Sequence, residues 1–149
     1  MVKILLGALQ PSYGTIKRAG FNAFYIDQDY SVIDEVLTVY EQAQQFNTGA
    51  LQEHEIRTRL NRFLFSADDL DKLCIALSGG EKMRLILCAL TIGYQAPDLI
   101  VLDEPTNNLD VQNIEILTTA VNGYQGTLVV ISHDQRFLSE INIMQDITV

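Results

Sequence analysis

The sequence predicts an α/β protein in which a parallel sheet carries an inserted α-helical segment. Two continuous apolar runs, LIVLD (99–103) and TLVVIS (127–132), have the composition of strands buried on both faces. A helical pattern over residues 111–122 separates them, and strands that alternate with helices favour parallel pairing. Residues 34–90 show helical patterns without a strand signal, so we interpret them as an insertion between core segments 1–33 and 91–149.

The other elements follow from apolar spacing and from turn residues. An apolar helix is expected over 1–10, stopped by Pro11, and a turn over 11–14. The β-branched and aromatic stretch around Phe24–Ile26 predicts a strand that ends at Asp27 and Gln28. Residues 147–149 are expected to form a last strand. Helical spacing predicts five further helices, over 34–45, over 53–65, a short one from Ser66, over 77–90 and over 134–140.

Net charge argues against a chain that coats nucleic acid. The 149 residues carry a formal charge of −9 at pH 7, so binding driven by charge alone is excluded. The bases are nonetheless concentrated in the middle of the chain. We interpret them as a solvated helical face in preference to a contact patch: Arg57, Arg59, Arg62, Lys72, Lys82 and Arg84.

Hydropathy and cysteine usage indicate a cytoplasmic protein. No apolar run approaches the roughly 20 residues that cross a bilayer, so direct membrane insertion is not expected. The N-terminus lacks the apolar region and cleavage site of a signal peptide. Cys74 and Cys88 have no CxxC spacing or neighbouring histidine cluster, which indicates two free thiols in a reducing compartment and no metal site of their own.

An adjacent pair of carboxylates, Asp103 and Glu104, follows the apolar strand 99–103. Ligands of a parallel sheet sit at the carboxyl ends of its strands, so both are candidates for a site. Mg²⁺ is usually bound there by one or two carboxylates plus phosphate oxygens, which suits Asp103. Glu104 points differently and can orient or deprotonate a water, while Pro105 ends the strand. An acidic strand end without function is the equal alternative when this pair is considered alone.

The segment LSGGE (77–81) is a second candidate site. Ser78 and Glu81 have the spacing of a capping box at a helix start. Capping does not explain Gly79 and Gly80, because glycine is unfavourable in a first helical turn. Two glycines leave the backbone N–H groups open to an anion, and the Ser78 hydroxyl adds a donor, so the segment predicts a phosphate cradle.

Two further polar residues follow predicted strands. His133, in SHD (132–134), follows the second buried strand and could donate to a γ-phosphate or orient an attacking water. Gln28 follows the strand around Phe24–Ile26 and could bind Mg²⁺ or the same water. Each signal is weak alone, because a single histidine or glutamine is more often a surface residue.

Three motifs in their order and spacing resemble the ATP-binding-cassette (ABC) ATPases: LSGGEKMR (77–84), LIVLDEPTNNLD (99–110) and VVISHDQRFL (129–138). Within that family, FLFSADD (63–69), EPTNNLD and YQGTLVVISHDQRFL are similar to the soluble ABC-F proteins. The resemblance covers residues 1–149 and implies a P-loop NTPase-like parallel sheet with an inserted helical subdomain.

The resemblance implies a role for each matching residue. Glu104 is expected to be the catalytic base and His133 the switch histidine, while Asp103 and the Q-loop residue Gln28 are the expected magnesium ligands. The expected ATP-binding residues lie in the Q-loop, the signature and the D-loop: Gln28, Ser78, Gly79, Gly80, Glu81 and Asp110. In the family, a signature reaches Mg·ATP held by another cassette, so the implied partners are a second ABC cassette and, for ABC-F, the ribosome.

The glycine-rich P-loop of the family, G-x-x-x-x-G-K-[ST], does not occur in this sequence. Residues 2–16, VKILLGALQPSYGTI, instead resemble the stretch that follows that loop. We therefore expect a cassette cut just downstream of its phosphate-binding lysine, without the strand that belongs beside TLVVIS. Such a chain should bind ATP poorly and hydrolyse essentially none. Its open sheet edge should be covered by a partner chain or by a second copy.

Three functions fit the resemblance. The first is part of an ABC-F ATPase, whose parent hydrolyses ATP and acts on the ribosome. The second is the ATP-binding subunit of an ABC transporter, coupled to membrane domains through the helical insertion. The third is a non-catalytic module that pairs with a complete cassette and donates only its signature.

Overall fold

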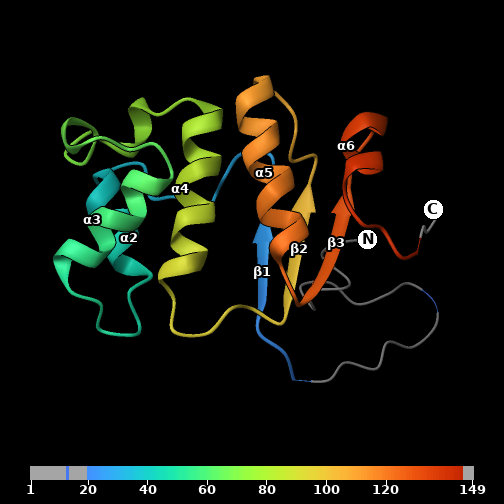
Figure 1. The fold of residues 1–149 in the computed structure, drawn as a ribbon, viewed down its shortest axis with the longest axis horizontal. Coiled ribbons are helices and arrows are strands. Elements are labelled where there is room, and N and C mark those ends of the chain that lie inside the picture. Colours follow the sequence, from blue (N-terminus) through green and yellow to red (C-terminus); the bar gives the residue numbers. More distant parts are fainter. Residues whose placement is uncertain (1–12, 14–19, 146–149) are drawn as a thin grey trace.

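The sheet consists of three parallel strands in the computed structural model, which describes residue 13 and residues 20–145 (Figure 1). They are β1 (Ala23–Ile26), β2 (Leu99–Asp103) and β3 (Thr127–Ile131), in the order β1-β2-β3. Ile26 pairs with Leu102, and Asp103 pairs with Ile131. Because the strands are parallel and nearly in register, their carboxyl ends lie along one edge of the sheet. The predicted parallel α/β fold is therefore confirmed.

The helices lie beside the sheet and over one of its faces. The helices α2, α3 and α4 pack together at one side, α5 lies over the strands and α6 stands next to β3 (Figure 1). The helical elements are α2 (Val39–Gln45), α3 (Glu53–Arg62), η1 (Ala67–Asp69), η2 (Cys74–Ala76), α4 (Gly79–Ile92), α5 (Val111–Gly123) and α6 (Gln135–Glu140). No helix of the described part is long and apolar enough to cross a membrane.

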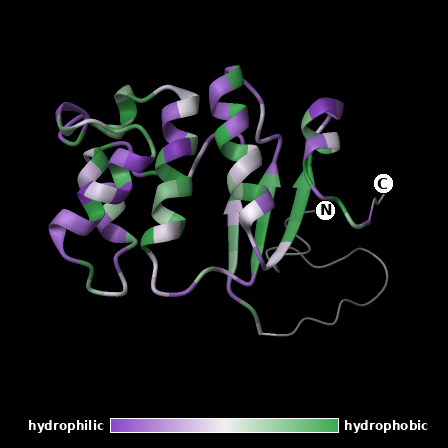
Figure 2. Cartoon of the chain, viewed as in Figure 1, coloured by the Kyte–Doolittle hydropathy of each residue, from purple (hydrophilic) through white to green (hydrophobic). Residues whose placement is uncertain are grey.

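Alternation along the strands gives the sheet two chemically different faces. Ile26, Ile100 and Leu102 line an apolar hollow of about 320 Å³ together with Leu87 of α4 and Leu117 of α5. The hydrophobic colouring of β2 and β3 in Figure 2 agrees with this packing. Tyr25, Val101 and Asp103 alternate with the hollow-lining residues and so belong to the opposite face. The strand ends therefore offer polar groups on the face away from α4 and α5.

The hydrophobic core runs without a break from the helical segment to the sheet. Val39 of α2, Ile56 of α3, Leu85 of α4 and Leu117 of α5 are fully buried in one cluster with Ile26 of β1. The two parts therefore stabilise each other through shared burial. The predicted division of the chain at residues 34 and 90 stays a prediction.

The start of α2 differs from the sequence prediction. The helix begins at Val39 and not near residue 34, because Thr38 caps it by accepting a hydrogen bond from the Glu41 N–H. The residues ahead of it form a short antiparallel pairing with 72–75. In this pairing Cys74 N–H donates to the Leu37 carbonyl at 2.8 Å, and Thr38 bridges Leu73. A contact between segments so far apart in sequence has no local signature.

Other boundaries differ by a few residues. The helix expected over 53–65 ends at Arg62, since Leu64 adopts a left-handed φ of 64°. The helix expected over 77–90 begins after its cap Ser78 and continues to Ile92. The helix expected over 1–10 and the strand expected over 147–149 lie outside the described residues, as does most of the turn over 11–14.

Candidate functional site

The structure brings three sequence-predicted residues to one edge of the sheet. Asp103 is the last residue of β2, and Glu104 follows it directly. His133 comes two residues after the end of β3, which pairs with β2. The His133 ring nitrogen Nε2 lies 3.4 Å from Glu104 Oε1, and the His133 backbone N–H approaches Glu104 Oε2 at 3.4 Å. Asp103, Glu104 and His133 are therefore neighbours in space.

Glu104 is held in an unusual backbone conformation. Its φ of 50° lies in the left-handed region, which is unfavourable for a residue with a side chain. A hydrogen bond of 2.7 Å from its N–H to the Ile131 carbonyl fixes it to β3. The Glu104 side chain is only 12% exposed, whereas that of His133 is 97% exposed. Strain of this kind is typical of sites where function dictates the geometry.

Asp103 has a hydrogen-bond donor that sequence reasoning missed. The Tyr25 hydroxyl, from neighbouring β1, donates to Asp103 Oδ2 at 2.8 Å. Burial raises the pKa of Tyr25 to about 12, aided by this hydrogen bond and by the negative charges of Asp103 and Asp27. The phenol therefore stays protonated and remains a donor at neutral pH. Strand register could have indicated this pair, since Tyr25 lies opposite Val101 on the face that Asp103 shares.

Gln28 projects from a tight turn after β1. The Tyr30 N–H donates to the Asp27 carbonyl at 3.2 Å, which closes the turn, and Tyr30 itself has a left-handed φ of 54°. The Asp27 carboxylate accepts hydrogen bonds from the Ser31 N–H and hydroxyl at 2.8 and 2.5 Å. Asp27 is thus used in shaping the turn, while Gln28 is exposed at the same sheet edge as Asp103.

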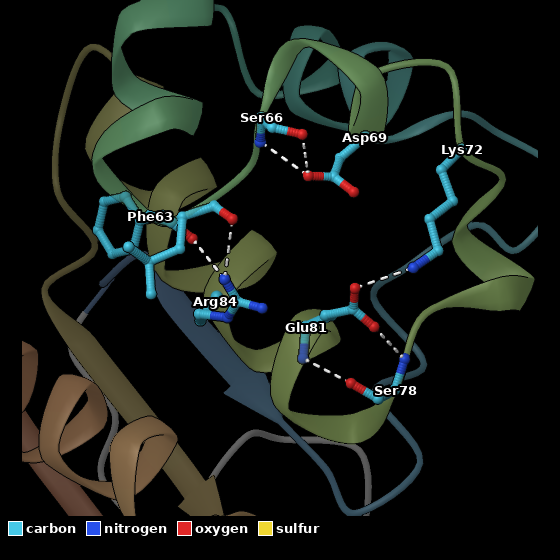
Figure 3. A network of polar contacts seen from close by, with 8 residues as sticks. Phe63, Ser66, Asp69, Lys72, Ser78, Glu81 and Arg84 are labelled. Carbon is cyan, nitrogen blue, oxygen red and sulfur yellow. Dashed lines mark hydrogen bonds and ion pairs between the residues drawn. The ribbon is translucent and has the colours of Figure 1, made fainter.

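A closed hydrogen-bond network surrounds the N-terminus of α4 (Figure 3). Ser78 Oγ accepts from the Glu81 N–H at 3.3 Å, and Glu81 Oε2 accepts from the Ser78 N–H at 2.8 Å, which is the predicted capping box. Lys72 donates to Glu81 Oε1 at 2.9 Å. Burial opposes ionisation of Glu81, but the hydrogen bonds from Lys72 and Ser78 outweigh it and lower its pKa. Glu81 is therefore occupied within this network, while the Ser78 hydroxyl keeps a proton to donate.

The two glycines of this helix start have different surroundings. A Cβ on Gly80 would overlap the Asn113 side-chain amide, whereas a Cβ on Gly79 would lie 3.7 Å from the Tyr30 ring, an ordinary contact. The absence of a side chain at Gly80 is therefore required by packing against α5. Packing is thus a structural reason for glycine at position 80, in addition to the expected phosphate cradle. At position 79 packing does not require glycine, so Gly79 is the one whose missing side chain would leave the backbone N–H groups open to an anion.

Asp110 has a defined structural contact. Its Oδ1 accepts from both the backbone N–H and the side-chain amide of Asn113, at 2.8 and 2.9 Å, and so caps α5. The buried Asn113 is the residue that packs against Gly80. Asp110 thus fixes the contact between α5 and the start of α4, and its predicted part in ATP binding stays a prediction.

Most bases in the middle of the chain are used internally. Lys82 pairs with Glu35 at 2.8 Å, and Arg57 pairs with Glu53 at 2.8 Å. Arg59 donates to the Thr91 carbonyl. Arg84 donates to the Phe63 and Leu64 carbonyls at 3.0 and 3.2 Å and thereby satisfies the C-terminal end of α3 (Figure 3). These contacts provide little free positive charge for a nucleic acid. The predicted solvated face holds for Arg57 and Arg62, which are exposed. It is wrong for the bases that are half-buried against their partners: Arg59, Lys72, Lys82 and Arg84.

Comparison with known proteins decides the family. The sequence profile of the family described as "ABC transporter" matches residues 1–107. The chain belongs to the ABC family. The resemblance of its motifs to ABC ATPases is thereby confirmed, and its residues 77–110 contain the ABC motifs LSGGEKMR and LIVLDEPTNNLD.

Its relatives within the ABC family include F-type members. It is 40% identical over 144 residues to probable ATP-binding protein YbiT of Escherichia coli O157:H7, covering 95% of this chain and 27% of that protein. It is 35% identical over 151 residues to ABC transporter F family member 5 of Arabidopsis thaliana, covering 95% and 20%. The chain thus spans about a quarter of the length of these relatives.

A solved structure agrees with the ABC fold. The complex of archaeal ribosomal stalk protein aP1 with archaeal ribosome recycling factor aABCE1 matches with a TM-score of 0.71 at 28% identity, covering 94% of this chain and 27% of that chain. The parallel sheet and the helical segment of this chain therefore belong to the P-loop NTPase fold of ABC cassettes.

The residues at the sheet edge fit a magnesium ion held mainly by phosphate. Among residues 13 and 20–145, no group of three or more His, Cys, Asp or Glu side chains could hold a metal ion. A single carboxylate such as Asp103 is the kind of protein ligand that Mg²⁺ takes together with substrate phosphates. Among the described residues, the Asp103 carboxylate accepts from Tyr25 through Oδ2, and no described residue donates to Oδ1. Cys74 and Cys88 are free, as predicted, and buried away from this edge.

Proposed function

We propose that this chain is part of the ATPase cassette of an ABC-F protein, and that its parent protein binds and hydrolyses ATP. Parent protein here means the longer protein in which a phosphate-binding P-loop precedes this segment. One observation carries the proposal: Glu104 is half-buried, strained and in contact with His133 beside Asp103, at the edge where parallel sheets bind ligands. This chain covers only 27% of the length of YbiT, which supports a longer parent protein.

Each side chain has a task in the proposed reaction. When bound, Mg²⁺ neutralises charge on the phosphates, and Asp103 would hold it through Oδ1. Glu104 accepts a proton from the attacking water, and its carboxylate lies against His133. His133 holds the Glu104 carboxylate from one side and presents an exposed ring to the phosphate end of the substrate. Gln28 reaches the same edge from β1.

The signature end of α4 serves a second cassette in the proposed function. Ser78 and the Gly79 backbone stand at a helix N-terminus, where N–H groups favour an anion. The capping network of Ser78, Glu81 and Lys72 is complete within the described residues. A preformed signature supports pairing with another cassette, and we include a cytoplasmic location and the ribosome as proposed context.

Nucleotide titration tests the proposal. The parent protein should bind Mg·ATP, whereas this chain alone should bind it poorly and hydrolyse essentially none, because residues of the P-loop are needed to hold the β- and γ-phosphates. Isothermal titration of both with Mg·ATP, next to a phosphate-release assay, measures the difference. Micromolar binding by this chain alone would refute the expected dependence on the P-loop.

Ribosome pelleting separates the ABC-F role from the transporter role. The structural match to the archaeal ribosome recycling factor aABCE1 favours the ribosome. The parent protein should therefore sediment with ribosomes when ATP is bound and hydrolysis is blocked. A parent protein that does not sediment with ribosomes, but does sediment with membranes, would support a transporter subunit.

A non-catalytic role is the second candidate, favoured by the self-contained signature network. In that case this chain would act by donating Ser78 and Gly79 to a complete cassette. Mixing the chain with a complete cassette and measuring ATPase activity tests this role. Stimulation that disappears in Ser78→Arg would support it, and unchanged activity would exclude it.

A further inference from the structure

We propose that Tyr25 is a positioning residue that orients the Asp103 carboxylate toward the magnesium ion of bound ATP. The inference deepens the proposed function and rests on it. Its basis is one contact, the 2.8 Å hydrogen bond from the Tyr25 hydroxyl to Asp103 Oδ2. Tyr25 does not reach the substrate in this role and acts only through the carboxylate.

Sheet register explains why this tyrosine reaches that aspartate. Tyr25 pairs with Val101, so Asp103 lies two residues further along β2 and on the same face of the sheet. Adjacent strands lie about 4.7–4.9 Å apart, so a residue two positions further along the neighbouring strand is within the span of a tyrosine side chain. A phenylalanine would fill the same space and leave Asp103 Oδ2 without this donor.

The contact divides the two carboxylate oxygens between different tasks. Oδ2 accepts from Tyr25, and no described residue donates to Oδ1. None of the ion pairs of the described residues includes Asp103, so no lysine or arginine of residues 20–145 neutralises its negative charge. A carboxylate that is held through one oxygen, and whose other oxygen has no donor among the described residues, suits the strict geometry that Mg²⁺ requires. Donors behind a ligand orient it and set its affinity for the metal.

A second tyrosine of the chain provides a matched comparison. Tyr124 is also half-buried and also donates through its hydroxyl, but its acceptor is the backbone carbonyl of Pro97. That carbonyl lies at the amino end of β2, away from Asp103 at the carboxyl end. Removing either hydroxyl deletes one hydrogen bond, but only the Tyr25 bond ends on the proposed metal ligand.

The experiment compares Tyr25→Phe with Tyr124→Phe in the parent protein. Tyr25→Phe should weaken Mn²⁺ binding in the presence of ADP about tenfold, measured by electron paramagnetic resonance of free Mn²⁺, as losses behind metal ligands typically do. The Mg²⁺ concentration for half-maximal ATPase activity should rise by about the same factor. Nucleotide binding in EDTA should stay unchanged, and Tyr124→Phe should change none of the three.

The outcomes separate this inference from the proposed function. Equal Mn²⁺ affinities for wild type, Tyr25→Phe and Tyr124→Phe would overturn the role of Tyr25 while leaving ATP hydrolysis intact. A loss of EDTA nucleotide binding in Tyr25→Phe would also overturn it, since that result indicates general damage to the site. A wild-type parent that binds no nucleotide under any condition would refute the proposed function itself.

Discussion

The start of α4 and the carboxyl ends of the strands are built on opposite principles. At α4, Ser78, Glu81 and Lys72 satisfy one another within the chain. At the strand ends, Glu104 is strained and His133 is almost fully exposed. The first region is stable without a ligand, whereas the second retains unfavourable geometry and unused polar groups. The satisfied hydrogen bonds that stabilise a helix start and the strained, exposed groups of a candidate catalytic site therefore lie in separate parts of this fold.

Substitution of Gly80, the second of the two signature glycines, should give the largest effect on stability. Gly80→Ala should lower the free energy of unfolding by about 3 kcal/mol, because its methyl group overlaps the buried Asn113 amide. Gly79→Ala is the matched control and should change it by less than about 1 kcal/mol, since space exists beside Tyr30. Urea denaturation measures both. Equal effects would contradict the close packing of α4 on α5.

Loss of the Arg84 hydrogen bonds should give the second-largest decrease in the free energy of unfolding. Arg84→Met keeps much of the side-chain volume but removes the donors to the Phe63 and Leu64 carbonyls. We expect the free energy of unfolding to fall by about 2 kcal/mol, the scale of hydrogen bonds from a charged group. Arg62→Met, at the exposed last residue of α3, should have little effect. A comparable loss in both variants would show that charge, and not the end of α3, is responsible.

Relief of the backbone strain at Glu104 should instead increase the free energy of unfolding. Glu104→Gly should raise the free energy of unfolding of this chain by about 1 kcal/mol, because glycine adopts a φ of 50° without strain. In the parent protein the same variant should lose ATP turnover. Thermal unfolding and phosphate release measure the two properties. A destabilised Glu104→Gly would show that the side chain at this position contributes more to the fold than its backbone strain removes.

The ion pair beneath the signature should give the smallest and pH-dependent effect. Because the folded pKa of Glu81 is lowered from its usual 4.5, its contribution is present above that pH and is lost as pH falls through the folded pKa. Glu81→Gln should therefore lower the free energy of unfolding by about 0.5–1 kcal/mol at pH 7, and this effect should shrink as the pH falls from 4.5 through the folded pKa.

Glu53→Gln, which removes an exposed pair with Arg57, is the control for this pH series. Its effect should be close to zero across the whole pH series, because exposed ion pairs contribute little. A pH-independent loss in Glu81→Gln would mean that shape, and not charge, holds the helix start together.

Sequence patterns predicted those features that depend on neighbours along the chain. The strands 99–103 and 127–131 and the helix after Asp110 follow from apolar periodicity, and the Ser78 capping box follows from local spacing. Features that depend on segments far apart could not be derived in this way. The late start of α2 depends on its pairing with 72–75, and the need for Gly80 depends on Asn113 of another helix.

The same limit applies to the candidate site. Placement of Asp103, Glu104 and His133 at one edge could be expected, because parallel strands bring their carboxyl ends together. The Tyr25 donor and the left-handed backbone of Glu104 could not, since they depend on register and on a hydrogen bond to β3. Sequence thus predicted which polar residues gather at this edge, while the contacts that hold them became visible only in the fold.

Replacement of Glu104 by glutamine in the parent protein tests the central claim most directly. The amide keeps the shape of the side chain but cannot accept a proton, so turnover should fall at least about 100-fold while Mg·ATP binding stays intact. Phosphate release and nucleotide titration on the same preparation measure the two quantities. Normal turnover by Glu104→Gln would contradict the claim that the carboxyl ends of β2 and β3 hold the catalytic base.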